Sequence, residues 1–92
     1  MHSILQDKKE CYVTGRTDGL HEHHIFYGSS RKMSERHGLK VWLYHLYHVG
    51  SDLAVHGGNR SLDIRLKREA QAKFEETHTR EEFIKAFGRS YL

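Results

Sequence analysis

Histidine is the residue type in this chain with the greatest capacity for chemistry. The sequence holds nine histidines, and seven of them fall in one stretch: His21, His23, His24, His37, His45, His48 and His56. Imidazole is a preferred protein ligand of zinc, nickel and similar ions, and it titrates close to neutral pH. The clustering predicts metal or proton chemistry, and a surface that is merely rich in histidine is the simpler alternative.

Two groups of these histidines can contribute to one site. The adjacent His23 and His24 point to opposite faces of an extended segment unless the strand ends or bulges there, and Gly28 favours an ending. One imidazole can then bind a cation while its neighbour acts as a base. A second group, His45, His48 and His56, lies on either side of the loop at residues 50–52 and can close the site. The spacing alone is not diagnostic of a metal site.

The elements that must position these histidines are short and extended. Residues 11–14 and 20–27 have extended patterns separated by the turn sequence at 15–19, which predicts a loose hairpin or a strand with an irregular approach. Residues 39–47 are the most hydrophobic stretch. They predict a buried strand, or a strand that runs into a turn.

Helices are predicted on both sides of this second extended stretch. Ser30 is placed to cap a short basic helix that Gly38 ends in a left-handed conformation. From Ser61 the apolar period changes to four, which predicts a long amphipathic helix through Leu62, Leu66, Ala70 and Phe74. Thr79 and Glu82 form a capping box for a final helix that ends at Gly88.

Length and composition limit the remaining choices. A chain of 92 residues and 10.8 kDa predicts one domain over residues 1–92, with a tail at 1–10, a histidine-rich ribbon with loops at 11–60 and a helical part at 61–92. So small a core rarely supplies more than about 3 to 5 kcal/mol, so a metal or a partner is expected to help. The lone Cys11 excludes an internal disulfide and fits a reducing compartment. The absence of a long apolar run predicts a soluble, cytoplasmic protein with no membrane contact.

Five segments carry a more specific pattern when they are taken in order. They are CYVTGR at 11–16, LHEHHIF at 20–26, GLKVWL at 38–43, GSDLAVH at 50–56 and FGRSYL at 87–92. Together they resemble the HNH, or ββα-metal, nucleases, in particular the small versions encoded by phages and prophages of bacteria. The resemblance implies an α+β fold in which a small antiparallel β-ribbon packs on a helix, with an additional C-terminal helix.

The resemblance also implies a site and an activity. His23 would be a ligand of a single divalent metal ion and His24 the general base, with distal ligands from His48 and His56. Nitrogen ligands suit Zn²⁺, Ni²⁺, Co²⁺ or Mn²⁺ better than Mg²⁺. Asp52 and His45 are candidates for contacts that orient the ligand rings without binding the metal itself. Loop capping is the simpler role for Asp52. The implied reaction is hydrolysis of phosphodiester bonds in DNA inside a bacterial host cell.

The sequence departs from the family pattern at two places. Where many relatives carry the four ligands of a structural zinc knuckle, this chain has Cys11, Thr14, Tyr44 and Tyr47, so that zinc is expected to be absent and aromatic packing to replace it. The middle asparagine of the family has no counterpart between the two histidine groups. The only asparagine is Asn59.

Basic residues flank the predicted site. The candidates for contacts with DNA phosphates are Arg31, Lys32, Arg36, Lys40, Arg60 and Arg65. Farther along the long helix, Lys67 and Arg68 are as easily explained as a solvated face, because several glutamates lie near them. The net charge of +3 steers DNA only weakly.

The sequence therefore predicts a metal-dependent DNA endonuclease with a place in phage recombination, replication or packaging, alone or with other phage or host proteins of those processes. The alternative is a non-catalytic DNA- or protein-binding module that keeps the ββα-metal scaffold. A third interpretation is a structural protein whose histidines only staple a small core with a metal ion.

Overall fold

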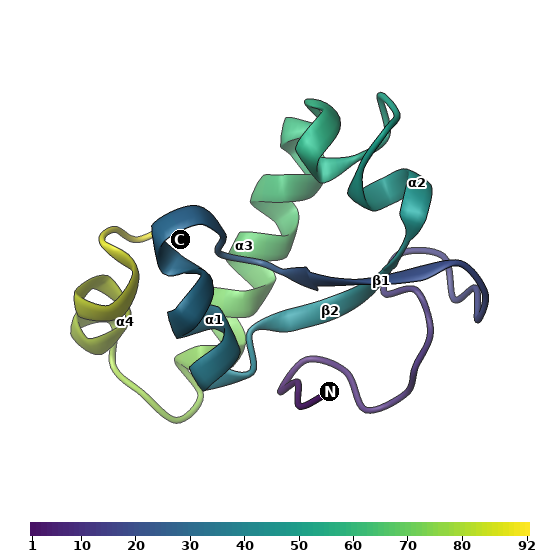
Figure 1. Cartoon of the computed structure of the whole chain (residues 1–92). Coiled ribbons are helices and arrows are strands. Elements are labelled where there is room, and N and C mark those ends of the chain that lie inside the picture. Colours follow the sequence, from purple (N-terminus) through teal and green to yellow (C-terminus); the bar gives the residue numbers. More distant parts are fainter.

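A computed structural model describes all 92 residues and shows a two-stranded antiparallel sheet that crosses in front of a long helix (Figure 1). The strands are β1 (Leu20–His24) and β2 (Lys40–Tyr44), and the helices are α1 (Arg31–His37), α2 (His45–His48), α3 (Arg60–Phe74) and α4 (Arg80–Phe87). Short 3₁₀ turns cover Gly28–Ser30 and Val55–Gly57. The fold is α+β, as predicted, and it is compatible with a ββα core that carries an additional C-terminal helix. None of its helices combines the length and the apolar character needed to cross a membrane.

The register of the two strands decides which side chains share a face. His23 lies opposite Val41, and His24 lies opposite Lys40. Because side chains alternate along a strand, one face carries His21, His23, Val41 and Leu43, and the other carries Leu20, Glu22, His24, Lys40, Trp42 and Tyr44. Val41 and Leu43 are fully buried and belong to the same core cluster as Leu62 and Leu66 of α3. The first face is therefore the one that meets the core.

The second strand is shorter than residues 39–47 and runs into a helical turn, the second of the two predicted outcomes. The strand β1 begins only at Leu20, after Gly19 in a left-handed conformation at φ +60°. The backbone N–H of His45 donates to the carbonyl of Gly19 at 2.8 Å, and the chain then turns into α2. Pairing of β2 stops at Tyr44, opposite Leu20, where β1 begins, and the helical turn that follows carries His48.

The segment at residues 11–14 is a turn and not a strand. The amide of Gly15 donates to the carbonyl of Cys11 at 2.8 Å, and the amide of Tyr12 donates to the carbonyl of Trp42 at 2.9 Å. Of the two predictions for this region, the structure shows the irregular approach, with regular pairing confined to Leu20–His24.

The N-terminal tail is pinned along the free edge of β2. The amide of Ile4 donates to the carbonyl of Gly38 at 2.9 Å, and the amide of Trp42 donates to Oε1 of Gln6 at 2.8 Å. Ile4 and Leu5 pack against the core, as the sequence requires if the tail is not to fray. The tail thus covers the open edge of β2 and reaches α3, where Ile4 and Leu5 line a hollow with Glu69.

The helix caps are largely those that the sequence predicts. The helix α3 begins at Arg60, one residue earlier than predicted, because Oδ1 of Asn59 accepts from the amide of Leu62 at 3.2 Å. Thr79 and Glu82 form the predicted capping box of α4, and Gly88 ends that helix at φ +92°. Gly38 ends α1 at φ +67°, also as predicted.

Two details of these helices complete the fold. Ser30 occupies the N-cap position of α1, but its side chain makes no capping hydrogen bond, unlike the prediction.

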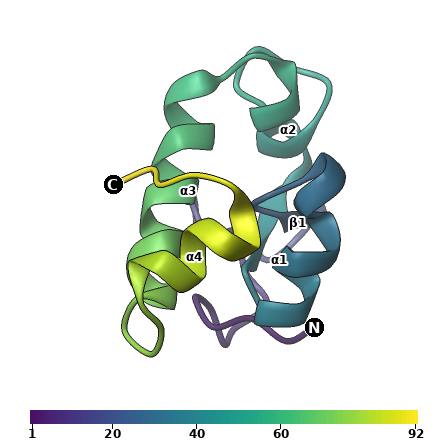
Figure 2. The same cartoon turned by 90° about the vertical axis from the view of Figure 1, so that its left-hand side faces the viewer.

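Figure 2 shows α4 lying in front of the lower half of α3, with α1 beside it. The ring of Phe83 in α4 lies 5.5 Å from that of Phe74 in α3, and the ring of Phe87 lies 4.5 Å from that of Phe26. The final helix therefore closes one end of the core.

Candidate metal centre

Three histidines from three separate elements converge at the end of β1. His23 comes from β1, His48 from the last residue of α2, and His56 from the 3₁₀ turn Val55–Gly57. One ring nitrogen of each lies within 4.8 Å of those of the other two. The ring centroids are 5.2 Å apart for His23 and His48, 5.2 Å for His23 and His56, and 4.9 Å for His48 and His56. We call this group the His23 cluster, and it brings together all three predicted ligands.

His23 is buried without any hydrogen-bond partner. Its side chain is 1% exposed, and neither Nδ1 nor Nε2 has a partner. Buried polar atoms are nearly always paired, and an unpaired one destabilises a fold by about 1–3 kcal/mol. A divalent cation bound by one of these nitrogens would supply a missing partner. The donor set and the orphaned nitrogens therefore fit a metal ion.

The protonation state of the cluster also suits a metal. Burial, together with the proximity of His48 and His56, lowers the pKa of His23 to about 3. Burial and the proximity of His56 and His21 lower the pKa of His48 to about 4. Metal ligands must be deprotonated. At neutral pH both rings are neutral and have a lone pair to offer.

His21 contacts the cluster, and sequence reasoning missed it. Its Nδ1 lies 3.0 Å from Nδ1 of His48, so one of these nitrogens donates and the other accepts. This contact leaves Nε2 as the remaining ring nitrogen of His48. The signal for His21 was the two-residue period of a strand, which puts it on the same face as His23.

The ring of Tyr27 packs against one side of the His23 cluster. The ring of Tyr27 lies 4.8 Å from that of His56, and its hydroxyl donates to Oδ1 of Asp63 at 3.0 Å. Nζ of Lys67 lies 2.9 Å from Oδ2 of Asp63 and 4.5 Å from the centre of the Tyr27 ring. Lys67 is thus part of this support and not of a free solvated face. The support holds Tyr27 against His56.

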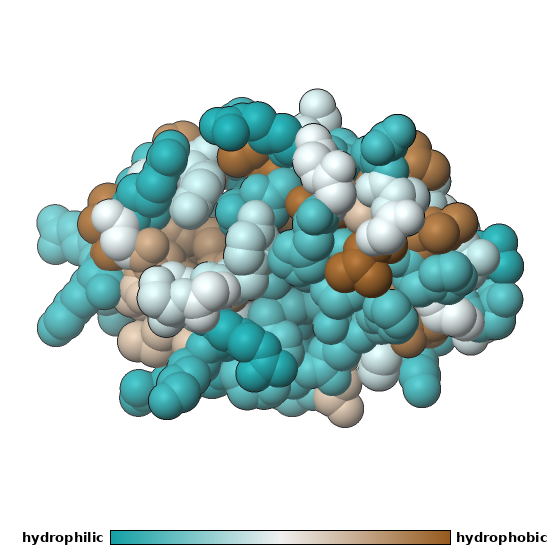
Figure 3. All heavy atoms as spheres, turned by 45° about the horizontal axis from the view of Figure 1, so that its top comes forward, coloured by the Kyte–Doolittle hydropathy of each residue, from teal (hydrophilic) through white to brown (hydrophobic).

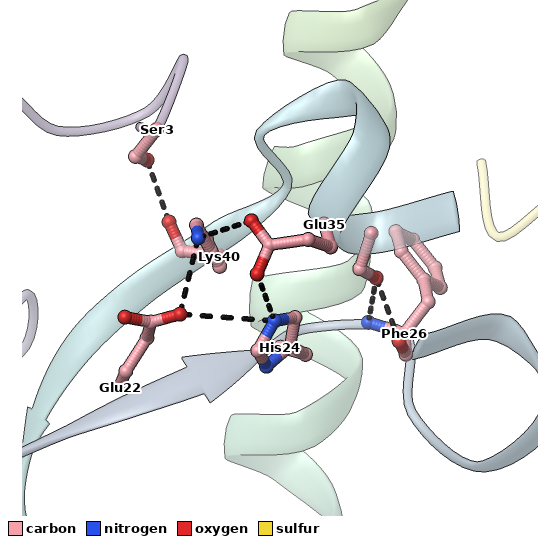
Figure 4. A network of polar contacts seen from close by, with 7 residues as sticks. Ser3, Glu22, His24, Phe26, Glu35 and Lys40 are labelled. Atoms are coloured by element: carbon pink, nitrogen blue, oxygen red, sulfur yellow. Dashed lines mark hydrogen bonds and ion pairs between the residues drawn. The ribbon is translucent and has the colours of Figure 1, made fainter. Parts of the chain in front are cut away.

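His24, the predicted base, lies in a separate polar network on the other face of the ribbon (Figure 4). Its Nε2 is 3.1 Å from Oε1 of Glu35 and 3.7 Å from Oε1 of Glu22. Nζ of Lys40 lies 3.1 Å from the same oxygen of Glu22 and also pairs with Oε2 of Glu35. We call Glu22, His24, Glu35 and Lys40 the Glu35 cluster. Sequence reasoning missed both of its carboxylates.

The Glu35 cluster already contains a cation. Glu22, His24 and Glu35 by themselves have the composition and spacing of a metal-binding group. The ammonium of Lys40 contacts both carboxylates, and Lys40 is only 4% exposed. The better candidate for a metal centre is therefore the His23 cluster, which has no lysine among its members.

One pocket joins the two clusters. It has a volume of about 290 Å³ and is lined by Glu22, His23, His24, Tyr27, Arg31, His48 and His56. Neighbouring residues of a strand point to opposite faces, but β1 ends at His24, earlier than the predicted end of the extended segment at residue 27, and both histidines line the same pocket. The pocket thus holds a candidate metal site beside an imidazole that is not part of it.

The structure separates the six basic residues that were predicted to contact DNA. Only Arg31 lines the histidine pocket. Arg60 and Arg65 line another hollow along α3 together with Arg68, and Arg36 lines a third one between α1 and α4. Lys32 is exposed on α1.

Lys40 does not fit the prediction of a DNA contact. It was chosen for its position between the histidine groups, but its place in the strand register turns it toward His24 and away from solvent. Glu22 and Glu35 occupy its ammonium. A phosphate would have to displace both carboxylates to reach it.

The two candidate orienting residues lie outside the His23 cluster. Asp52 is exposed in the loop after α2 and is not among the residues that surround the cluster. The ring of His45 lies 6.1 Å from that of His21 and 4.5 Å from that of Tyr44. His45 therefore reaches the cluster only through His21, which has the orienting contact that His45 was predicted to make.

The positions that correspond to a zinc knuckle are part of the core or its edge. Cys11 is buried in the apolar cluster, and its Sγ accepts from the amide of Thr14 at 3.4 Å. Tyr44 and Tyr47 pack against the same cluster. Asn59 is used at the start of α3, where its Nδ2 also donates to the carbonyl of Leu53 at 2.8 Å. It thereby ties down the loop that leads to His56.

No model of a known protein family matches the chain, and no curated protein or solved structure matches it either. The resemblance to HNH nucleases thus stays a prediction from the residues, and the geometry of the two clusters is the independent ground for a functional proposal.

Proposed function

We propose that this protein is a metal-dependent endonuclease that hydrolyses phosphodiester bonds in DNA. The observation that carries the proposal is the buried His23, unpaired at both ring nitrogens, in a cluster with His48 and His56, with His24 lining the same pocket. A metal site and an adjacent uncoordinated base are the two components that hydrolysis of a phosphodiester requires of a one-metal enzyme.

Each component has a defined role in the proposed reaction. His23, His48 and His56 hold one divalent cation, for which Zn²⁺, Ni²⁺, Co²⁺ and Mn²⁺ are the best matches to nitrogen ligands. When bound, such a cation supplies Lewis-acid stabilisation of the charge that develops on the phosphate and on the leaving oxygen. Arg31, the one arginine that lines the pocket, pairs with a phosphate oxygen of the substrate.

His24 takes the proton from the attacking water. The water oxygen forms a bond to phosphorus, the bond from phosphorus to the leaving 3′ oxygen breaks, and that oxygen takes a proton from solvent. A neutral imidazole is suited to this step near neutral pH. Because the Glu35 cluster holds the ring on one side, the histidine has a fixed position beside the pocket.

The surface around the pocket is consistent with a polar substrate. Figure 3 looks down on the top of Figure 1, where α2 and the start of α3 lie. Hydrophilic side chains dominate this face, and the apolar ones form separate patches. Such a face favours a charged polymer over a partner that needs a continuous apolar interface.

The proposal is tested by plasmid nicking. Protein stripped with a chelator and reloaded with Mn²⁺, Ni²⁺, Zn²⁺ or Mg²⁺ is expected to nick DNA with at least one of these ions. His24→Ala is expected to abolish nicking while the fold and the bound metal remain. Full activity of His24→Ala would remove this residue from the mechanism, and inactivity of the wild-type protein with every ion would reject the nuclease.

One observation favours a second candidate function, a non-catalytic DNA-binding module. Arg60, Arg65 and Arg68 line a hollow of about 680 Å³ on α3, apart from the histidine pocket. Arginines on one helix face can neutralise phosphates without any chemistry. Salt-sensitive DNA binding that is lost in Arg65→Gln or Arg68→Gln, with no cleavage under any cation, would favour this function.

A further inference from the structure

The Glu35 cluster holds the ring of His24 in one orientation, and the proposed reaction would use that orientation. Nε2 of His24 faces Oε1 of Glu35 at 3.1 Å, and Nδ1 has no hydrogen-bond partner. Nδ1 of His24 is not fully enclosed, because the only fully buried ring nitrogens without a partner are the two of His23. The two ring nitrogens of His24 thus have different surroundings, one carboxylate-bound and one open.

A carboxylate determines which nitrogen holds the hydrogen of a neutral imidazole. An ionised carboxylate only accepts hydrogen bonds, so the nitrogen that faces it must donate. Glu35 is ionised, because its hydrogen bonds to Lys40 and then to His24 lower its pKa to about 2. In the neutral ring the hydrogen therefore lies on Nε2 and the lone pair on Nδ1.

Lys40 fixes the carboxylate in turn. Its ammonium contacts one oxygen of Glu35, and the other oxygen of Glu35 contacts His24. Lys40 is buried and is also held by Glu22 at 3.1 Å. Figure 4 shows the ammonium between the two carboxylates, with the ring of His24 on their other side. Each oxygen of Glu35 thus has its own partner, and the carboxylate has little freedom to rotate.

From this geometry we infer that Glu35 is a positioning residue, which keeps the hydrogen of His24 on Nε2 so that Nδ1 accepts the proton of the attacking water. The inference rests on the proposed function and extends it to residues on α1 and β2 that do not line the pocket. When Nδ1 takes the proton from water, the ring becomes a cation, and the carboxylate of Glu35 stabilises it.

A comparison of two variants at one position separates this role from a structural one. In Glu35→Gln the amide oxygen is drawn to Lys40, because an ammonium only donates. The amide NH₂ then faces Nε2 of His24 and requires a lone pair there, which moves the ring hydrogen to Nδ1. In Glu35→Ala the ring keeps only Oε1 of Glu22 near Nε2, at 3.7 Å and beyond hydrogen-bond distance, so it samples both tautomers. The conservative variant is therefore expected to be the worse enzyme.

The expected losses differ by orders of magnitude. Glu35→Gln is expected to lower kcat by about 10³- to 10⁴-fold, as a wrong tautomer does in a catalytic triad, and Glu35→Ala by about 10- to 100-fold. KM for DNA is expected to stay unchanged in both. The double variant Glu35→Gln/Lys40→Met frees the amide to rotate and should regain part of the lost kcat. Glu81→Gln, at an exposed carboxylate in the first turn of α4, is the matched control and should keep full activity.

The tautomer is measured directly, without any activity. Two-bond nitrogen–proton correlations of ¹⁵N-labelled protein, metal-free and loaded with Zn²⁺, are expected to show His24 with its hydrogen on Nε2, and Glu35→Gln is expected to reverse this pattern. The spectrum of His24→Ala assigns the signals. A hydrogen on Nδ1 in the wild-type protein, or Glu35→Gln more active than Glu35→Ala, would overturn the inference. If the wild-type protein cleaves no DNA, the proposed function fails, and the spectrum alone decides the tautomer.

Discussion

The two clusters at the end of the ribbon differ in how their polar atoms are paired. In the Glu35 cluster two carboxylates, an imidazole and an ammonium pair with one another, and Lys40 supplies the positive charge. In the His23 cluster three imidazoles face one another, and His23 has no partner at all. The first is complete as it stands. The second leaves the ring nitrogens of His23 unpaired, and under the proposed function a cation would complete it.

This contrast indicates a division of labour along one short strand. Alternation in β1 turns Glu22 and His24 to one face and His21 and His23 to the other. On the face that contains Lys40, two carboxylates and the ammonium hold the imidazole of His24 in place. On the face that contains His21 and His23, the only polar strand side chains are imidazoles, which offer lone pairs. Two different tasks are thereby assigned to adjacent residues.

The largest expected effect tests this division through metal affinity. His23→Ala removes the buried ligand and is expected to weaken binding of Zn²⁺ by more than about 100-fold, because even residues that only support a ligand change affinity by about 10- to 100-fold. His24→Ala, the neighbouring substitution, is expected to keep one equivalent of Zn²⁺. Isothermal titration with a competing chelator measures both. Equal losses in the two variants would mean that the clusters are not distinct.

Metal binding should also stabilise the fold. An ion that binds the folded chain alone adds about 2.7 kcal/mol to the free energy of unfolding at a free concentration of 100 times its Kd. For a domain of this size that corresponds to a rise in Tm of roughly 10 to 20 °C. Calorimetry with and without Zn²⁺ checks the expectation. The same rise in His23→Ala would place the ion somewhere other than the His23 cluster.

A smaller effect is expected when the internal cation of the Glu35 cluster is removed. Lys40→Met leaves two carboxylates without their shared partner and is expected to lower Tm by several degrees at neutral pH. Hydrogen bonds from Lys40 and then from His24 lower the pKa of Glu35 to about 2 from its ordinary 4.5. A lowered carboxylate pKa adds stability above pH 4.5, and this contribution is lost as the pH falls through 2. The difference in free energy of unfolding between wild-type and variant is therefore expected to narrow between pH 4.5 and 2.

Urea unfolding at a series of pH values measures this difference. The matched control is Lys73→Met, because Lys73 forms a single exposed ion pair with Glu76 at 3.1 Å. Pairs of that kind contribute little. A Lys40→Met variant as stable as Lys73→Met at neutral pH, or a gap between wild-type and Lys40→Met that widens in acid, would contradict the view that Lys40 completes its cluster.

The sequence predicted the His23 cluster better than the Glu35 cluster, and the reason is physical. Histidine is rare enough that seven in one stretch stand out, and Gly28 indicated that the strand ends nearby, although β1 stops already at His24. Glu35 lies 11 positions from His24 on a separate helix, and its contact with the ring depends on how α1 packs. Lys40 faces His24 only through strand register, which no local pattern reveals. Lys40 was therefore predicted to contact DNA, although it is buried in the Glu35 cluster.

The fold shows the same division between local and non-local information. Capping residues such as Thr79 and Glu82, and the left-handed Gly38 and Gly88, predicted helix ends because their effects act within one turn. The switch from β2 to α2 at His45 was left open by the sequence. It depends on where β1 begins to pair, which is a property of the other strand.

The smallest expected effect concerns the loop that only the His23 cluster depends on. Asn59 caps α3 and donates to the carbonyl of Leu53. Asn59→Ala is therefore expected to lower the free energy of unfolding by about 1 kcal/mol. It is also expected to weaken Zn²⁺ binding several-fold, because the loop that carries His56 is held less firmly. Thr79→Ala removes a similar cap from α4, far along the chain from all three ligands, and is expected to lose about the same stability with no change in Zn²⁺ affinity. Urea unfolding and zinc titration of both variants give the comparison. Equal Zn²⁺ affinity in the two would mean that His56 is held in place by its packing against Tyr27 and not by the cap, whereas a loss confined to Asn59→Ala would tie the start of α3 to the metal centre.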